Sequence, residues 1–510
     1  MRILLIFVTI SFIVSTATAQ LSHKAFNLDA PSPRPSSNSI SQILISGNVV
    51  YLGTEKGLNL TADGGMTFKT DFGANGPTGI GISAIAVKGD TLIVAASTTF
   101  EQSGTSYPEG AGLFVSTDKG NSWSLKPQSI DSLYDSTVTY GSNRLKALPI
   151  TTRVNNVTYS LAFYKGFLYS ANFAGGLRRT SDLGKTWQRV TLPPDYLNYI
   201  SPDSVYNFQL SPVAGAITYE SNLNHRVFSL YSDGDSALYV GTADGINKTT
   251  DSGLTWKKFN HQNQMSPISG NFVVSITGND LSGKHYIWAA TVNANDPSEQ
   301  EGISYTADGG LSWQYVLTGH FFHSLAFNGK ILYAASDDGL YRSSDFGKTY
   351  QVITTILDPI TRQSILTNTY YAVAVENDTV WVGTSDGTAI GIDNGAGFDF
   401  NSWRVARAYQ PATSSSQTYF YPNPFSPKID IGRIHYTVTE ASAIVTIRIY
   451  DFSMHVIRTI IQNATRTHGD QDEIWNGLDE SGRTVDNGVY FYSIQINGGK
   501  LIWGKILVVR

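Results

Sequence analysis

One pattern recurs seven times between residues 40 and 407 and constrains the fold more than any other feature of the chain. Each copy has an apolar strand ending in small residues, a glycine, a short second strand, and an acidic turn closed by an aromatic residue. A period-2 apolar segment precedes the copies, as at residues 227–230, 324–327 and 372–375. Four short strands per unit are typical of a propeller blade, so the repeat predicts an all-β, seven-bladed β-propeller over residues 40–407. The copies span residues 51–68, 92–123, 168–187, 238–256, 287–313, 332–350 and 380–403.

The acidic turn has the form S/T-x-D-x-G-x-S/T-aromatic and is complete in six copies. An aspartate in such a turn accepts hydrogen bonds from its own backbone, glycine supplies a conformation that is costly for other residues, and the aromatic residue packs against a strand. The motif therefore predicts a hairpin and by itself no activity. In the seventh copy the turn is interrupted between Asp393 and Trp403. The six aspartates are Asp63, Asp118, Asp182, Asp251, Asp308 and Asp345.

These turns resemble the Asp-box, or bacterial neuraminidase repeat, of sialidase-like propellers, sortilin-type receptors, xyloglucan-cleaving glycosidases and Ycf48-like photosystem assembly factors. The resemblance implies a propeller and covers most of the chain. Seven blades close a ring without an exposed strand edge. A six-bladed sialidase-type ring with one extra hairpin is the alternative architecture.

The N-terminus and the composition indicate an exported protein. Met1 and Arg2 precede an apolar run (residues 3–14) and the small residues Ala17 and Ala19, which predicts a signal peptide over residues 1–19, followed by an N-terminal segment over residues 20–39. No later stretch has the roughly 20 apolar residues of a transmembrane helix. The absence of cysteine excludes disulfides and thiolate chemistry. A formal net charge of -5 without blocks of like charge favours no nucleic-acid partner, and we expect no cofactor.

A polar linker over residues 408–418 ends the repeat, and residues 419–510 show short alternating strands that predict an Ig-like β-sandwich. From its YPNPF opening (421–425) to its last apolar strand, this region resembles the FlgD-type sorting domain of the type IX secretion system. The resemblance implies export through that machinery to the cell surface or the medium. The sorting signal would include Gly488, Tyr490, Lys505 and Arg510. The alternative is a generic Ig-like module that stays attached.

Long insertions interrupt the repeat between the second and third strands of a blade or between blades, and we expect all of them on the face opposite the acidic turns. Loops on a rigid scaffold usually carry function. Tyrosines gather in them, and an exposed tyrosine suits a sugar ring or a protein partner. The alternative is that these tyrosines pack the insertions onto the propeller. The ligand-binding candidates are Tyr107, Tyr134, Tyr140, Tyr196, Tyr199 and Tyr206.

The sequence offers no complete catalytic motif. A sialidase needs three converging arginines, and the available ones are Arg153, Arg178, Arg226 and Arg362. A glycoside hydrolase needs two facing carboxylates, for which Glu109 and Glu301 are the loop candidates. His320 and His323 are close in sequence, but two histidines without a third ligand predict no metal site.

The function that we predict is a monomeric surface or secreted module that binds a glycan or a protein without catalysis. Every specific motif is explained by hairpin structure or by sorting, which leaves none that demands chemistry. The alternative is a glycoside hydrolase, sialidase-like or xyloglucanase-like, acting through carboxylates on the insertion-bearing face.

Overall fold

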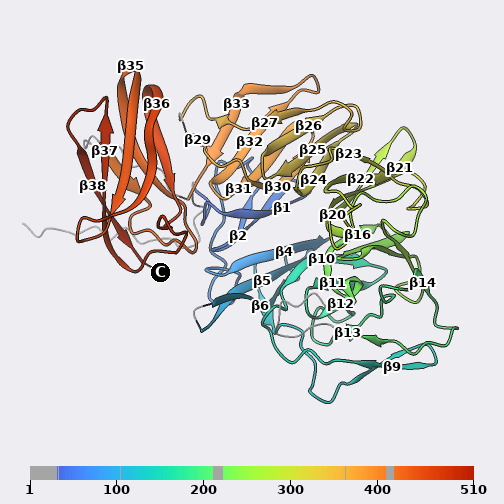
Figure 1. Cartoon of the computed structure of the whole chain (residues 1–510). Coiled ribbons are helices and arrows are strands. Elements are labelled where there is room, and N and C mark those ends of the chain that lie inside the picture. The colour runs from blue at the N-terminus through green and yellow to red at the C-terminus, as the bar shows by residue number, and fades with distance from the viewer. Residues whose placement is uncertain are drawn as a thin grey trace, which may run out of the picture.

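The computed structural model describes residue 32 and residues 34–103, 105–210, 222–361, 363–408 and 418–509, and Figure 1 shows them as two bodies built of strands. The described part holds one 3-10 helix, η1 (Leu223–His225), and no α-helix. None of its helices is long and apolar enough to cross a membrane. The all-β class, a propeller followed by an Ig-like domain, is confirmed. The predicted signal peptide, most of the linker, Arg362 and Arg510 lie outside the described residues.

Seven antiparallel sheets follow one another along residues 40–406, and each is numbered here as a blade. Each blade runs outward in chain order from its first strand. The strands are β1 (Ile40–Ser46), β2 (Val49–Thr54) and β3 (Gly57–Thr61) in blade 1; β4 (Gly81–Lys88), β5 (Thr91–Gln102), β6 (Thr105–Ser116) and β7 (Ser124–Lys126) in blade 2; β10 (Thr158–Tyr164), β11 (Phe167–Asn172), β12 (Gly176–Thr180) and β13 (Gln188–Arg189) in blade 3; β16 (Val227–Asp233), β17 (Ala237–Thr242), β18 (Gly245–Thr249) and β19 (Trp256–Phe259) in blade 4; β20 (Phe272–Leu281), β21 (Lys284–Val292), β22 (Gly302–Thr306) and β23 (Gln314–Val316) in blade 5; β24 (Phe322–Asn328), β25 (Ile331–Ser336), β26 (Gly339–Ser343) and β27 (Gln351–Ile353) in blade 6; and β30 (Tyr370–Glu376), β31 (Thr379–Thr384), β32 (Gly387–Asp393) and β33 (Phe398–Ala406) in blade 7.

The first strands of the blades form a closed ring. In order, β1, β4, β10, β16, β20, β24 and β30 each lie against the next, and β30 lies against β1. Blades 1 and 7 share a core in which Ile40 and Leu52 pack with Trp381. Trp403, beyond the interrupted seventh turn, is buried within blade 7. The predicted count of seven blades agrees with these sheets and stays a prediction.

The acidic turns share one hydrogen-bonding geometry. At Asp182, the Thr180 hydroxyl donates to Oδ1 (2.7 Å), the Thr186 backbone N–H donates to Oδ1 (2.9 Å) and the Thr186 hydroxyl donates to Oδ2 (2.7 Å). The hydrogen bonds from Thr186 and Thr180 lower the pKa of Asp182 to about 2, so the carboxylate is ionised at neutral pH. Equivalent bonds form at the other five aspartates, Asp63, Asp118, Asp251, Asp308 and Asp345.

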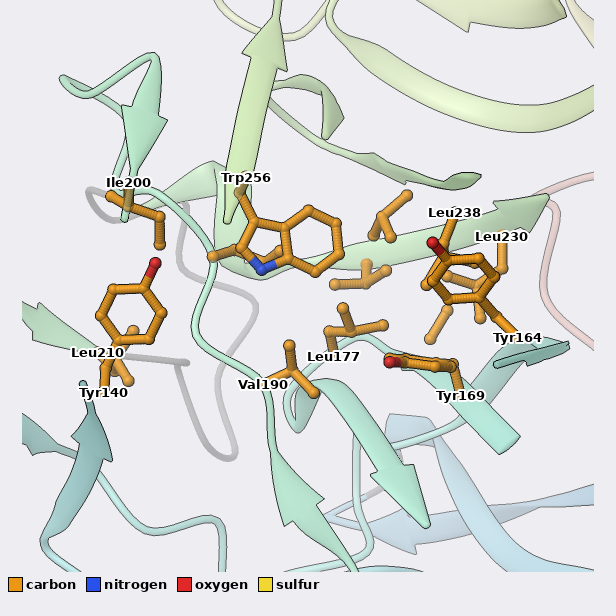
Figure 2. Close-up of a cluster of buried hydrophobic side chains, with 14 of the residues drawn as sticks. Tyr140, Tyr164, Tyr169, Leu177, Val190, Ile200, Leu210, Leu230, Leu238 and Trp256 are labelled. Carbon is orange, nitrogen blue, oxygen red and sulfur yellow. The ribbon is translucent and has the colours of Figure 1, made fainter. Parts of the chain in front are cut away.

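The insertions of blades 2 to 4 add small sheets on the outer rim of the ring. β8 (Thr137–Tyr140), β9 (Asn143–Ala147) and β15 (Gln209–Leu210) form one sheet, and β14 (Tyr199–Ile200) extends blade 4 beyond β19. Figure 2 shows their apolar side chains meeting Trp256 and Leu177 of the propeller in one core. A further pair, β28 (Ile356–Leu357) with β29 (Ser364–Ile365), lies between blades 6 and 7 in the chain.

The prediction that all insertions lie opposite the acidic turns is wrong for residues 126–154. The hydroxyl of Tyr140 donates to the carbonyl of Leu254 (2.6 Å), which is part of the acidic turn of blade 4. The physical reason is the apolar side of this insertion: Leu145 and Ala147 are buried with Val190 of blade 3. Because this apolar side is buried, the insertion packs along the outer rim of the propeller and does not lie on a single face.

The C-terminal domain packs five strands around one apolar core: β34 (Thr418–Tyr421), β35 (Gly432–Tyr450), β36 (Val456–Trp475), β37 (Gly488–Ile496) and β38 (Ile502–Val508). The long β35 pairs with β36 along most of its length, with β34 in its first half and with β37 in its second half. The long β35 therefore connects β34 at one end with β37 and β38 at the other end around the core.

The two domains touch through ion pairs. Lys56 of blade 1 meets Asp430 (3.2 Å), and Glu101 of blade 2 meets Lys428 (3.1 Å). A third pair joins Asp386 of blade 7 to Arg433, and both of these side chains are fully buried. The Ig-like domain thus rests on blades 1, 2 and 7.

The burial of two equivalent tryptophans predicts unequal losses of stability. Trp256 is fully buried and its indole N–H donates to the Gly253 carbonyl (3.2 Å), whereas Trp187 is only half-buried. We expect Trp256→Ala to lower the free energy of unfolding by about 3–5 kcal/mol, the usual cost of deleting a buried Trp. Trp187→Ala removes the same atoms and should cost clearly less. Urea unfolding followed by circular dichroism measures both, and equal losses would contradict the difference in burial.

Candidate binding surface

The six candidate tyrosines fall into two groups: two are part of a core, and four are accessible to different degrees. Tyr140 is buried, and its ring packs on that of Tyr206 (centroids 6.1 Å apart). The Tyr206 hydroxyl accepts a hydrogen bond from the Ser201 backbone N–H (2.9 Å). Figure 2 shows Tyr140 in the shared core with Ile200 and Trp256. These two tyrosines hold the insertions on the propeller, as the alternative interpretation expects.

The other four tyrosines are accessible to different degrees. Tyr134 is 89% exposed, Tyr196 is 72% exposed and Tyr199 is 54% exposed. Tyr107 is half-buried in a long hairpin of blade 2, where it pairs with Phe100. Of these four, Tyr199 lines a cavity in the described part of the chain.

That cavity is an open groove of about 600 Å³ between the outer strand of blade 4 and the acidic turn of blade 5. Met265 and Leu311 project from it and are largely exposed. Asn263 donates to the side-chain oxygen of Asn198 (3.0 Å), and Gln264 donates to the Gly310 carbonyl (2.7 Å). The lining of the groove therefore combines side-chain amides held by hydrogen bonds with the aromatic ring of Tyr199. The lining residues are Asn198, Tyr199, Lys257, Lys258, Phe259, Asn263, Gln264, Met265 and Leu311.

Tyr199 is predicted from the sequence as a binding residue, whereas the other residues of this groove are not. Residues 263–265 lie in an insertion that was recognised by its length, but amides and a methionine in a loop carry no motif. Leu311 stands at a variable position of an acidic turn. Only the folded chain brings these separate segments together.

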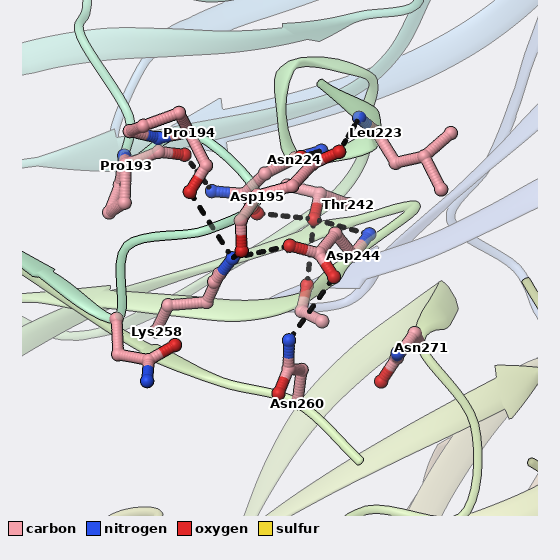
Figure 3. A network of polar contacts seen from close by, with 12 residues as sticks. Pro193, Pro194, Asp195, Leu223, Asn224, Thr242, Asp244, Lys258, Asn260 and Asn271 are labelled. Carbon is pink, nitrogen blue, oxygen red and sulfur yellow. Dashed lines mark hydrogen bonds and ion pairs between the residues drawn. The ribbon is translucent and has the colours of Figure 1, made fainter. Parts of the chain in front are cut away.

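A buried polar network fixes the segment that carries Tyr199 (Figure 3). The Asp195 carboxylate accepts backbone N–H groups of Leu223 (2.9 Å) and Asn224 (2.9 Å) in η1. The ammonium group of Lys258 donates to the Asp195 carbonyl (2.6 Å) and meets the Asp244 carboxylate. Burial raises the pKa of Asp244 to about 6, although Lys258 lowers it. The network ties the insertion to strands β17 to β19.

Asp244 belongs to a second recurring turn, which was not predicted from the sequence. The turn has the form S/T-x-D-G, at residues 242–245, 336–339 and 384–387. In each turn the aspartate N–H donates to the Ser or Thr hydroxyl, and that hydroxyl donates to the glycine carbonyl. Each aspartate also contacts a basic side chain from another segment of the chain. The pairs are Asp244 with Lys258, Asp338 with His320 (2.9 Å), and Asp386 with Arg407 (3.1 Å).

The candidate catalytic groups are not brought together. Glu109 lies in blade 2 and is paired with Arg153 (3.0 Å), while Glu301 lies beside blade 5, with blades 3 and 4 between them in the ring. The arginines have separate partners: Arg178 is buried against Asp131 (2.8 Å), and Arg226 lies over the ring of Phe173 (5.5 Å). These contacts are structural.

His320 and His323 point to different carboxylates. His320 contacts Asp338 (2.9 Å), and His323 Nε2 contacts Asp337 (2.8 Å). Among the described residues, no group of three or more His, Cys, Asp or Glu side chains is arranged to hold a metal ion.

The predicted sorting residues fall on both sides of the last hairpin. The Tyr490 ring packs on Trp475 in the core (centroids 5.9 Å apart) and its hydroxyl donates to the Asp486 carbonyl (2.9 Å). Lys505 is exposed on the outer side of β38, which also presents Trp503 and Leu507. Gly488 begins β37.

The YPNPF segment covers the free edge of this hairpin. The backbone N–H of Phe425 donates to the Leu507 carbonyl (2.8 Å), and the Leu507 N–H donates to the side-chain oxygen of Asn423 (2.8 Å). The last strand is therefore bonded on both sides, which protects an edge that would otherwise be open to pairing.

The chain is similar to a family model in its C-terminal part and to several solved structures over most of its length. Residues 428–500 match the family model of the FlgD Ig-like domain. YCF48 from Cyanidioschyzon merolae is 15% identical, with 71% of this chain and 97% of that chain covered and a TM-score of 0.41. The GH74 enzyme of Niastella koreensis is 14% identical, with 93% and 73% covered and a TM-score of 0.47. PorZ, described as a surface component of the type-IX secretion system of Porphyromonas gingivalis, is 14% identical, with 92% and 87% covered and a TM-score of 0.24.

No curated protein matches the chain. The fold defines a β-propeller protein. Its C-terminal part carries a FlgD Ig-like domain.

The Lys258–Asp244 pair predicts a pH-dependent loss of stability. Lys258→Met leaves a buried carboxylate without its cation, which typically costs about 3–5 kcal/mol. The folded-state pKa of Asp244 is already raised to about 6, against about 3.9 in an unfolded chain. Folding therefore takes up a proton, and this contribution is full below pH about 4 and lost as the pH rises through about 6.

We expect the free energy of unfolding of Lys258→Met to fall most above pH 6, as measured by urea unfolding at pH 5 and pH 8. The double variant Lys258→Met/Asp244→Asn should recover part of the loss at pH 8, because the uncompensated charge is gone. An equal loss at both pH values without recovery would contradict the role of this pair.

Proposed function

We propose that this chain is an exported, non-catalytic binding protein that holds a glycan in the groove beside Tyr199. The groove combines an exposed aromatic ring with amide groups held by neighbouring backbone. Such a surface offers apolar area to the faces of sugar rings and hydrogen-bonding groups to their hydroxyls.

The composition of the groove carries the proposal. Among the described residues that line it, none is Asp or Glu. Hydrolysis of a glycosidic bond usually uses two carboxyl groups about 5–10 Å apart, one on each side of the bond. The lining therefore favours binding over the alternative of a glycoside hydrolase.

The first test is a glycan array with the purified chain, followed by titration of the best glycan. We expect Tyr199→Ala to weaken binding at least tenfold, a loss of about 1.4 kcal/mol, because the exposed ring is the largest flat surface in the groove. Tyr134→Ala is the matched control, since Tyr134 is 89% exposed and lies outside the groove.

Equal affinities of the Tyr199→Ala and Tyr134→Ala variants would place the ligand elsewhere. A chromogenic glycoside panel run beside the array tests the alternative. Turnover that disappears in Glu109→Gln or Glu301→Gln would replace the binding proposal by hydrolysis.

We also propose that the Ig-like domain delivers the propeller to the surface or the medium through type IX secretion machinery. The support is the signal-peptide pattern in residues 1–19 and the FlgD Ig-like match at residues 428–500. The exposed Trp503, Leu507 and Lys505 on the last strand offer a contact surface of apolar and basic character.

Deletion of residues 488–510 should therefore leave the propeller in the periplasm of a host with this machinery, as measured by cell fractionation. The propeller has its own cores and closes its ring without the Ig-like domain, so the propeller of the truncated chain should stay folded. Trp503→Ser/Leu507→Ser keeps the hairpin and tests the outer surface alone. Normal delivery of the truncated chain would favour an Ig-like module without a sorting role.

A further inference from the structure

The first strand of every blade contains a β-bulge at the same place, near its start. The pairing with the second strand shifts by one residue there in all seven blades. A bulge leaves one residue unpaired and re-aims its side chain. In chain order the extra residues are Ser41, Ser83, Tyr159, Phe228, Val274, His323 and Tyr371.

Aromatic bulge residues of neighbouring blades contact one another. Tyr159 and Phe228 come from neighbouring blades, and their ring centroids are 5.7 Å apart. His323 and Tyr371 also come from neighbouring blades, at 5.5 Å. The strands that carry these side chains are the first strands of their blades, which form the ring. Tyr159 is 37% exposed there.

Aromatic side chains at the bulge are not required by the blade. Three blades carry Ser41, Ser83 and Val274 at the same place, and their strands pair in the same way. The four aromatic rings therefore need a reason beyond blade geometry. Phe173 and Phe272 add to them, since their ring centroids lie 5.9 Å and 4.4 Å from that of Phe228.

Carboxylates lie on the side of the propeller ring that carries Tyr371. Asp337 Oδ1 contacts His323 Nε2 (2.8 Å), and Glu55 is exposed in the equivalent turn of blade 1. Burial raises the pKa of Tyr371, and the charges of Asp337 and Glu55 raise it further. Lys56, next to Glu55 in the chain, pairs with Asp430 (3.2 Å), and its charge also acts on Glu55.

Aromatic faces next to carboxylates select a cation, because the face of an aromatic ring is negative and the carboxylates add full charge. We propose that the centre of the ring, at the bulged ends of the first strands, is a second binding site that takes the lysine or arginine side chains of an extended protein segment. This site is separate from the groove at Tyr199 and its partner is of a different class.

The test uses a fluorescein-labelled hexalysine peptide and the full chain, with binding followed by fluorescence anisotropy. We expect saturable binding that weakens with salt. Glu55→Gln/Asp337→Asn should weaken it at least tenfold, and so should Tyr159→Ser/Tyr371→Ser, which uses the residue present at two equivalent bulges. Thermal melting confirms that each variant is folded.

The matched control is Glu376→Gln/Asp203→Asn, which removes two exposed carboxylates away from this site, one of them at the other end of β30. It should leave hexalysine binding unchanged, and Tyr199→Ala should do the same while losing the glycan. The proposal is overturned if hexalysine does not bind, if the two charge variants weaken it equally, or if maltohexaose displaces it.

Discussion

Closure of the ring is the constraint on which the rest of the structure depends. Blade 1 and blade 7 come from opposite ends of the propeller sequence, and their shared core includes Phe68, Trp381 and Ile390. Gly65 in the acidic turn of blade 1 has a positive φ, and a β-carbon there would lie 2.9 Å from the Trp381 ring and 2.6 Å from Ile390. The turn thus serves the closure as well as its own hairpin. Without this contact the two blades would expose the apolar side chains of their facing sheets to water.

The sequence predicted the blades well because each blade is made by local contacts. The aspartate, glycine and hydroxyl of an acidic turn act within five residues, so their spacing alone determines the hairpin, as at Asp182 and Thr186. The C-terminal domain was predictable from the alternation of its strands, although its YPNPF segment bonds to Leu507, which is far from it in the sequence.

The insertions could not be placed from the sequence. Leu145 and Ala147 mark an apolar side, but nothing in their pattern says whether it packs over the centre of the ring or around its rim. Tyr140 and Tyr199 look alike in sequence, and burial of one and exposure of the other follow from that packing. The groove likewise depends on Asn198, Gln264 and Leu311, which three separate segments bring together.

Repetition gives a way to separate structural residues from functional ones in this chain. At the S/T-x-D-G turn an aspartate recurs and contacts a basic side chain. In blade 4 this turn is packed against an insertion, and in blade 7 it is packed against the Ig-like domain. The aspartate carboxylate therefore anchors the segment that packs on the turn. At the bulge the backbone recurs but the side chain changes from serine to tyrosine, phenylalanine and histidine. A feature that every blade needs is explained by the fold. A side chain that varies at a position whose backbone is constant is not required by the blade, so the aromatic residues at the bulges of blades 3, 4, 6 and 7 need another explanation.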